Sequence, residues 1–266
     1  MATVVSLLPR LKRRSSPAHA PREDVQAMTP GQALSVTGEV CSLYRAATDV
    51  FALARDRSAT FHGVRRLTSG QRGKRISIFP SAINDGNIPC EGFPEKAHCL
   101  VLERLDTIAK YRSQPLSMRL PGGQLYTPDK ATLGHDGAIH LYEVKSRAIL
   151  ASPSVRAKLT AAKDLANLHG MGFHEVAHDE LPDELEAVRL ARYYHSKFFP
   201  WDRHALIQAL DRVLAVGQTA RFEELCTSLR HRAAPVRDIR HAIFLGHLLW
   251  DMTRELRPHS ELLRVR

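Results

Sequence analysis

Three residues in the middle of the chain carry the side chains that phosphodiester-cleaving sites use. Asp129, Glu143 and Lys145 supply two carboxylates and an ammonium group. Hard oxygen donors suit Mg²⁺ or Mn²⁺, and such a metal keeps several waters and meets the phosphate of a substrate. The metal activates water, and a neighbouring lysine stabilises the attacked phosphate or orients the water. The three residues therefore predict a magnesium-dependent hydrolytic site.

A β-hairpin would bring these residues together. The Gly-His-Asp-Gly run at 134–137 is typical of a hairpin turn, and the segments on both sides alternate apolar and polar residues. Alternation by two places Glu143 and Lys145 on one face of the second strand. A loop of about three residues then sets Asp129 opposite Glu143 on that same face.

An ordinary ion pair is the alternative for this hairpin. Glu-x-Lys is common in charged sequences, and a cross-strand pair between Glu143 and Lys145 on a solvated face has the same pattern. The Pro128-Asp129 step at hairpin distance favours a site instead.

The segments around the hairpin predict a complete domain. Pro94 is typical of a first helical turn, and Gly170 of a helix end. Periodicity predicts a helix from 94, strands at 109–120, 124–133 and 138–146, a helix at 153–168, a strand at 173–177 and a helix at 182–195. This order predicts an α/β fold, a mixed sheet flanked by helices.

The charge of the whole chain indicates an anionic partner. Its 266 residues include 38 Lys and Arg against 28 Asp and Glu, a net charge of +10. Because the arginines are spread along the chain, nucleic acid is the leading candidate, although a basic surface also serves solubility alone. The length suffices for one main domain and a smaller one.

The spacing of the cysteines and the hydropathy of the chain indicate the cellular compartment of the protein. The four cysteines are widely spaced and form no Cys-x-x-Cys pair, so neither a zinc ribbon nor a disulfide framework is expected. No apolar run approaches membrane-spanning length, and the N-terminus does not have the order of a secretory signal. We expect a cytoplasmic protein that contacts no membrane.

Composition divides the chain into three parts. Residues 1–60 are expected to form a basic arm and a helical segment, residues 61–198 the α/β domain, and residues 199–266 a small helical domain. Arg65 and Arg66 belong to a basic, glycine-containing stretch that we expect to lie along DNA, although a solvated charge run looks the same.

The C-terminal part has the order of a winged helix. Helical stretches at 205–216, 221–229 and 235–247 precede two expected strands, 248–255 and 260–265. Arg237 and Arg240 would then lie near the start of a DNA-recognition helix. Such domains bind proteins as readily as DNA, so a simple interaction domain is the alternative.

A formal zinc-protease pattern, His-Glu-x-x-His, occupies residues 174–178. That chemistry requires a helix, which places both imidazoles on one face. Two nearby glycines and the short space before Pro182 favour a strand, in which the histidines would stand roughly 13 Å apart. We expect no zinc site here.

The chain resembles the PD-(D/E)xK nuclease superfamily, and more narrowly the TnsA-type endonuclease subunit of heteromeric transposons. The residues that carry the resemblance are Gly63-Val64-Arg65-Arg66, Phe79-Pro80-Ser81, Glu91 to Glu95, Leu102-Glu103, Gln114-Pro115, Tyr126-Thr127-Pro128-Asp129 and Tyr142-Glu143-Val144-Lys145. The similarity spans about half of the chain. It implies a restriction-endonuclease-like fold.

The resemblance assigns roles to individual residues. It makes Asp129, Glu143 and the carbonyl of Val144 ligands of Mg²⁺, for which Mn²⁺ would substitute, and Lys145 the catalytic lysine. Glu95 matches the family's upstream acid, and Glu91 is the nearest substitute.

Two departures from the family pattern bear on these roles. Gly92-Phe93-Pro94 stands at the entry to the acid-bearing helix, where the proline either starts that helix at Glu95 or displaces its carboxylate. Lys130 follows Asp129 where an apolar residue is usual, and we expect it to face solvent or phosphate.

The resemblance also implies a reaction and partners. The protein would cut the non-transferred strand at the 5′ ends of a transposon, beside a DDE-type transposase and an ATPase regulator, in association with the bacterial nucleoid. A stand-alone nuclease for repair or defence is one alternative. A catalytically silent protein that binds DNA or assembles other proteins is another.

Overall fold

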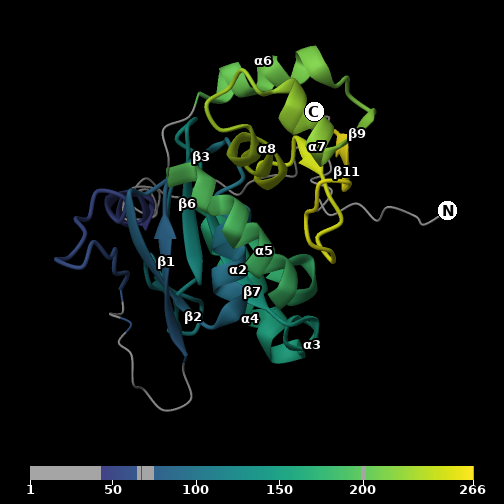
Figure 1. Ribbon diagram of the computed structural model, residues 1–266. Helices are drawn as coiled ribbons and strands as arrows, with labels where there is room; N and C mark the ends of the chain where they lie inside the picture. Colours follow the sequence, from purple (N-terminus) through teal and green to yellow (C-terminus); the bar gives the residue numbers. More distant parts are fainter. Residues whose placement is uncertain (1–42, 65–66, 68–74, 199–201, 266) are drawn as a thin grey trace, which may run out of the picture.

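A four-stranded mixed sheet between helices forms the centre of the molecule (Figure 1). The structure is a computed structural model that describes residues 43–64, 67, 75–198 and 202–265. The sheet has the order β3-β6-β7-β8, in which β8 runs parallel to β7 and the other neighbours are antiparallel. The predicted mixed α/β sheet flanked by helices is therefore confirmed.

The elements of this domain follow the predicted order. They are β1 (Ile76–Ser81), β2 (Gly86–Glu91), α2 (Phe93–Leu102), β3 (Ile108–Ser113), β4 (Met118–Arg119), β5 (Leu125–Tyr126), β6 (Lys130–Gly134), β7 (Ile139–Lys145), α3 (Arg147–Leu150), α4 (Pro153–Leu168), β8 (Gly172–Ala177) and α5 (Glu184–Tyr194). Short 3₁₀ turns follow β8 and α5.

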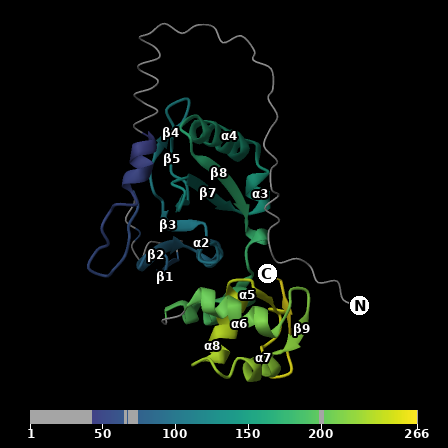
Figure 2. The ribbon, with the colours of Figure 1, turned by 90° about the horizontal axis from the view of Figure 1, so that it is seen from above.

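Helices cover both faces of the sheet. On one face, Ile139 and Leu141 of β7 share an apolar core with Leu159 and Ala162 of α4. On the other face α2 contacts both β7 and α5. Figure 2 shows this layering, with α4 on one side of β7 and β8, and α2 and then α5 on the other.

The central hairpin has the predicted loop. Residues 135–138 connect β6 to β7. The Gly134 N–H donates to the Ala138 carbonyl oxygen at 2.8 Å, which closes a three-residue loop at 135–137, and Gly137 adopts a φ of 82°, which favours glycine. The register pairs Lys130 with Tyr142 and Leu133 with Ile139. Continued by one residue, this register sets Asp129 opposite Glu143, as the three-residue loop predicts.

Two expected strands, 109–120 and 124–133, are broken in the structure. β3 ends at Ser113, because Gln114 takes a left-handed φ of 46° and Pro115 has no backbone N–H to donate to a sheet. The chain beyond forms the separate hairpin of β4 and β5 before it enters β6. The antiparallel pair β1–β2, which packs against α2, is a further element that the predicted order does not include.

The C-terminal unit contains the three predicted helices and one unexpected strand. Its elements are α6 (Arg203–Val213), β9 (Thr219–Arg221), α7 (Phe222–Ser228), α8 (Pro235–Phe244), β10 (Leu248–Leu249) and β11 (Glu261–Arg264). The strands form a small sheet in the order β10-β11-β9. β10 and β11 are shorter than the strands predicted at 248–255 and 260–265.

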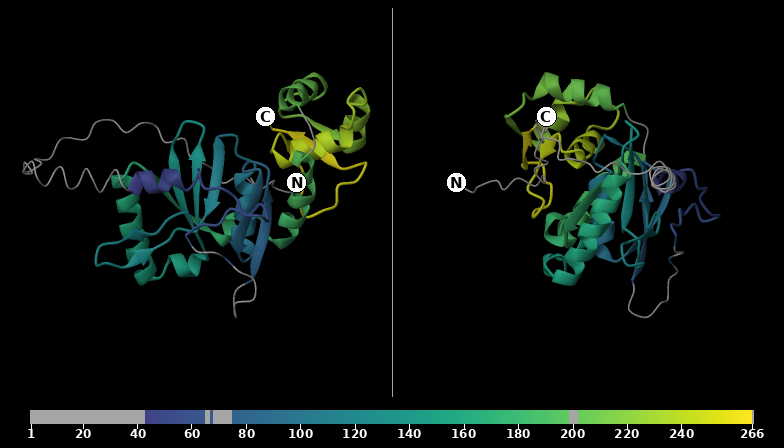
Figure 3. Two further views of the ribbon diagram at one scale, coloured as in Figure 1. Left: turned by 90° about the vertical axis from the view of Figure 1, so that its left-hand side faces the viewer. Right: turned by 180° about the vertical axis from the view of Figure 1, so that it is seen from behind.

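The C-terminal unit is joined to the sheet domain by a shared core. It lies at one end of that domain (Figure 3). Phe244 of α8 is fully buried, and its ring lies 5.2 Å from that of Tyr194 at the end of α5. One apolar cluster runs from Ile88 and Leu100 through α5 to Phe244 and Leu262. The two units therefore stabilise each other.

Candidate active site

The hairpin of β6 and β7 brings Asp129, Glu143 and Lys145 together. Asp129 directly precedes β6, whereas the other two lie on β7. The Lys145 Nζ atom is 3.1 Å from Asp129 Oδ2 and 3.1 Å from Glu143 Oε1. Glu143 and Lys145 share a face of β7, because alternate residues of a strand point the same way. One ammonium group thus bridges two carboxylates.

Further hydrogen bonds fix the two carboxylates. The backbone N–H of Val144 donates to Asp129 Oδ2 at 2.8 Å, and the Tyr126 hydroxyl donates to Glu143 Oε2 at 2.7 Å. Lys145 Nζ also lies 3.3 Å from the Val144 carbonyl oxygen. The Lys145 side chain is 33% exposed, against 13% for Asp129 and 8% for Glu143, so solvent reaches the cluster at the lysine.

The electrostatics of the cluster favour a bound cation. Burial raises the pKa of Glu143, and the neighbouring Asp129 carboxylate raises it further, while Lys145 opposes both. Burial lowers the pKa of Lys145, but the two carboxylates raise it more, so the net shift is upward and the lysine stays charged. With both acids ionised, two negative charges face one positive charge. A divalent cation would relieve their repulsion.

The donor set at this position fits a hard cation. Asp129, Glu143 and the Val144 carbonyl offer oxygen atoms alone, which Mg²⁺ and Mn²⁺ prefer, and water molecules would supply the remaining ligands. Within residues 43–64, 67, 75–198 and 202–265, no group of three or more His, Cys, Asp or Glu side chains could hold a metal ion. The oxygen set considered for a cation, two carboxylates and a carbonyl, is smaller than such a group.

Glu95 lies near this set but is bound to other groups. It sits in the first turn of α2, which begins at Phe93, so Pro94 does not displace Glu95 from the helix. Its Oε2 atom lies 3.8 Å from Lys130 Nζ and accepts a hydrogen bond from the backbone N–H of Glu91 at 3.0 Å. Burial raises the pKa of Glu95, and Asp129 adds to the shift. Glu95 is thus a neighbour of the cluster, held by a lysine.

The expectation that Lys130 faces solvent or phosphate is wrong. Its side chain is fully buried. Lys130 pairs with Tyr142 across the hairpin, so it points to the opposite face from Asp129, where α2 covers the sheet. Its Nζ lies 3.4 Å from Ser113 Oγ and 4.0 Å from Cys90 Sγ, in addition to Glu95. Strand alternation next to Asp129 was the signal that could have assigned Lys130 to that face.

The Gln-Pro step anchors the position of Asp129. The backbone N–H of Gln114 donates to the Asp129 carbonyl oxygen at 2.9 Å, and Gln114 Nε2 donates to Glu91 Oε1 at 3.2 Å. The Gln114 carbonyl in turn accepts from the Val64 N–H at 2.9 Å. Glu91 is therefore connected to the cluster through Gln114. These backbone contacts, and the Tyr126 hydroxyl, were not predicted from the sequence.

The predicted DNA-binding residues fall in two places. Arg65 and Arg66 lie outside the described residues. Arg237 and Arg240 lie on α8 in the C-terminal unit and line a pocket there. α8 packs against α5, and its role as a DNA-recognition helix stays a prediction.

The His-Glu-x-x-His pattern lies on a strand, as predicted. His174 belongs to β8, whereas His178 begins the 3₁₀ turn that follows. The Nε2 atom of His174 is 3.0 Å from Nδ1 of His140 on the neighbouring strand. The helical geometry of a zinc protease is absent from this stretch.

Comparison with known proteins leaves the family of the chain open. No family model matches it, and no curated protein matches it at a significant level. No helix in the described part of the chain combines the length and the apolar character that crossing a bilayer requires.

Proposed function

We propose that the protein is a metal-dependent DNA endonuclease that hydrolyses phosphodiester bonds. The observation that carries this proposal is the position of Lys145, 3.1 Å from both Asp129 and Glu143. The order of α2, β3, β6, β7, α4 and β8 around the cluster supports a restriction-endonuclease-like fold of the PD-(D/E)xK type. An ion pair with a structural role alone requires one acid beside Lys145, whereas this cluster has two, Asp129 and Glu143. Such a pair also does not require that solvent reach the lysine side chain.

The chain's own residues have distinct roles in this proposal. Asp129, Glu143 and the Val144 carbonyl would hold Mg²⁺, which supplies an activated water and charge neutralisation at the phosphate when it is bound. Tyr126 keeps the Glu143 carboxylate in one orientation through its hydrogen bond. Lys145 presents a positive charge at the solvent side of the cluster, where a phosphate would arrive. Glu95 would act from the neighbouring position on α2.

DNA is the proposed substrate because of the charge of the chain and its sequence resemblance. The net charge of +10 favours a polyanion. The resemblance to TnsA-type subunits points to the non-transferred strand at the 5′ ends of a transposon, with a DDE-type transposase and an ATPase regulator as partners. Cleavage without these partners would favour the stand-alone nuclease instead.

Nicking of a plasmid that carries the transposon ends tests the site. With Mg²⁺, the transposase and the ATPase present, we expect Asp129→Ala and Lys145→Met to lose cleavage, by about a hundredfold or more, and to retain DNA binding. Asp164→Asn on α4 and Lys110→Met on β3 are matched controls at exposed positions and should cleave normally. Unchanged metal-dependent nicking by both site variants would reject the proposal.

A silent assembly protein is the second candidate, and one observation favours it. Glu95 is bound to Lys130, which leaves two acids in the cluster. Thermal unfolding with increasing Mg²⁺ or Mn²⁺ separates the candidates, because a ligand that binds only the folded state stabilises it. The nuclease predicts a rise in Tm that Asp129→Ala abolishes, whereas the silent protein predicts no rise.

A further inference from the structure

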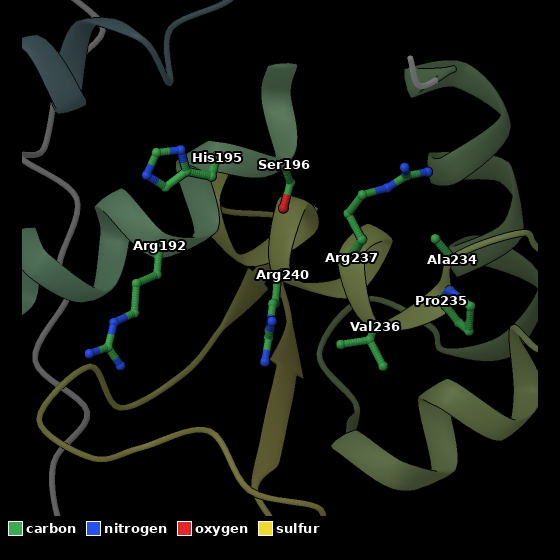
Figure 4. Close-up of a pocket in the computed structure, with 8 residues that line it drawn as sticks. All are labelled: Arg192, His195, Ser196, Ala234, Pro235, Val236, Arg237 and Arg240. Atoms are coloured by element: carbon green, nitrogen blue, oxygen red, sulfur yellow. The ribbon is translucent and has the colours of Figure 1, made fainter. Parts of the chain in front are cut away.

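A basic pocket lies between α5 and α8, in the C-terminal half of the chain. It has a volume of about 440 Å³ and is lined by Arg192 and His195 from one side and by Arg237 and Arg240 from the other. Figure 4 shows Arg192 and Arg240 extending in the same direction from the two helices. Both of these arginines are exposed, so their guanidinium groups are open to a ligand.

The charge of this pocket is positive. None of the described residues that line it carries a carboxylate. The nearest acid along α8, Asp238, is buried, lies 3.8 Å from Arg237 and is also bound by Arg232. One carboxylate is thus shared by two arginines. The arrangement leaves a concentration of positive charge that an anion would neutralise.

The packing of α8 limits what this pocket can recognise. A recognition helix inserts its exposed side chains into the major groove. Most of α8 is covered by α5 and the C-terminal core, and its buried residues are Asp238, Ile239, His241, Ala242, Ile243 and Phe244. The side chains of α8 left at the surface beside the pocket are Val236, Arg237 and Arg240, and the two arginines suit phosphate oxygens.

We infer that the pocket binds the phosphate backbone of duplex DNA, through Arg192 and Arg240 with Arg237 beside them, and does so independently of sequence. One guanidinium group binds two oxygens of a phosphate through two parallel hydrogen bonds. Two arginines on facing helices can therefore each bind a phosphate of the backbone. Because α2, α5 and α8 share one core, a duplex held here stays in a constant position relative to the hairpin site. The choice of DNA rests on the proposed function.

Salt-dependent binding tests the inference without catalysis. The affinity for a short fluorescein-labelled duplex is measured in EDTA at about 50 to 200 mM salt, by anisotropy, for the full chain and for Arg192→Gln/Arg240→Gln. Each phosphate contact contributes about −0.9 to the slope of log affinity against log salt. The slope of the double variant should be shallower than that of the wild type by about 2. Between the lowest and the highest salt concentration, the affinity of the double variant should therefore fall by a factor about ten times smaller than the affinity of the wild type does. The loss should be equal for unrelated duplex sequences.

Matched controls make the outcome specific. Arg221→Gln on β9 removes an exposed arginine of the same unit outside the pocket and should keep the wild-type slope. Equal Tm values for all variants show that they are folded. A charge reversal, Arg240→Glu, should weaken binding more than Arg240→Gln does.

Several results would overturn the inference. An unchanged slope in the double variant would do so, as would a loss confined to one duplex sequence, which indicates base reading. Binding of a phosphopeptide or inorganic phosphate that depends on these arginines, with DNA binding unchanged, assigns the pocket another ligand. If Asp129→Ala loses nicking but the arginine variants keep the wild-type salt slope, the proposed DNA binding by the pocket is refuted and the nuclease proposal stands. If the arginine variants change the salt slope but the wild-type protein shows no nicking, the nuclease proposal is refuted and DNA binding by the pocket stands.

Discussion

Asp129 and Lys130 are adjacent in the chain but serve opposite faces of the sheet. Asp129 turns toward Glu143 and Lys145, whereas Lys130 turns under α2 to Glu95. A charge buried without a partner costs several kcal/mol, so Lys130 and Glu95 depend on each other. The pair positions the acid that the family resemblance assigns to the site. It also provides a second ammonium close to Asp129.

A double-mutant cycle on Lys130 and Glu95 measures this dependence. Lys130→Met should lower the free energy of unfolding by about 3–5 kcal/mol, because it leaves Glu95 buried without its ammonium. Glu95→Gln should also destabilise, and the double variant should be more stable than the sum of the two predicts. Urea unfolding followed by circular dichroism gives the three values. Additivity within about 0.5 kcal/mol would show that the two residues do not interact.

At the scale of elements, α2 covers the face of the sheet opposite to the cluster of Asp129, Glu143 and Lys145. It carries Glu95 in its first turn and packs against β7 with its next turn. His98 on that turn is buried, 5.1 Å from the Tyr142 ring, and its Nδ1 atom has no hydrogen-bond partner among the described residues. Burial, Lys130 and His174 lower the pKa of His98 to about 3. The histidine is therefore neutral in the folded protein.

This buried histidine predicts a pH dependence of stability. Between pH 6.5 and about 3 the unfolded chain binds a proton at His98 that the folded protein does not bind. The free energy of unfolding therefore decreases as the pH falls, by about 2 kcal/mol between pH 7.5 and 5 from this group alone. His98→Phe should remove that part of the decrease, and His204→Gln, at an exposed position, should leave it. Urea unfolding at pH 7.5 and at pH 5 gives these values. If His98→Phe showed the same decrease in the free energy of unfolding as the wild type, the assignment to His98 would be wrong.

At the scale of the whole molecule, the shared core links the C-terminal unit to the sheet domain. Phe244 packs on Tyr194 across the boundary expected near residue 199, and the cluster around it reaches both units. A core that crosses the boundary predicts that the two units unfold together. The docked position of α8, and with it the pocket of Arg192 and Arg240, depends on this packing.

Phe244→Ala tests the coupling between the units. The change should lower the free energy of unfolding by about 3–5 kcal/mol, because it opens a cavity in the shared core. Both tryptophans of the chain, Trp201 and Trp250, belong to the C-terminal part, so their fluorescence reports on it, whereas far-UV circular dichroism reports on the whole. The two signals should shift together in urea. Val236→Ala, at a position 41% exposed on the same helix, should change stability by less than about 0.5 kcal/mol. A separate fluorescence transition would show independent units.

Local patterns were sufficient for α4 and for the central hairpin. The bounds of α4 agree with the predicted 153–168, because Pro153 begins that helix and Gly170 follows its end. The loop at 135–137 and strand alternation together predict the pairing of Asp129 with Glu143. Turns, caps and alternation depend on neighbouring residues, so they can be read along the chain.

The sequence by itself determined which residues form the hairpin and which face carries Asp129, Glu143 and Lys145. Only the tertiary structure decided that Lys130 is buried against Glu95 and that α8 is docked on α5. Both outcomes depend on which distant helix covers a given face. The alternation of a strand shows that a residue points to one side, but packing between segments far apart in the chain decides whether that side meets solvent or a helix.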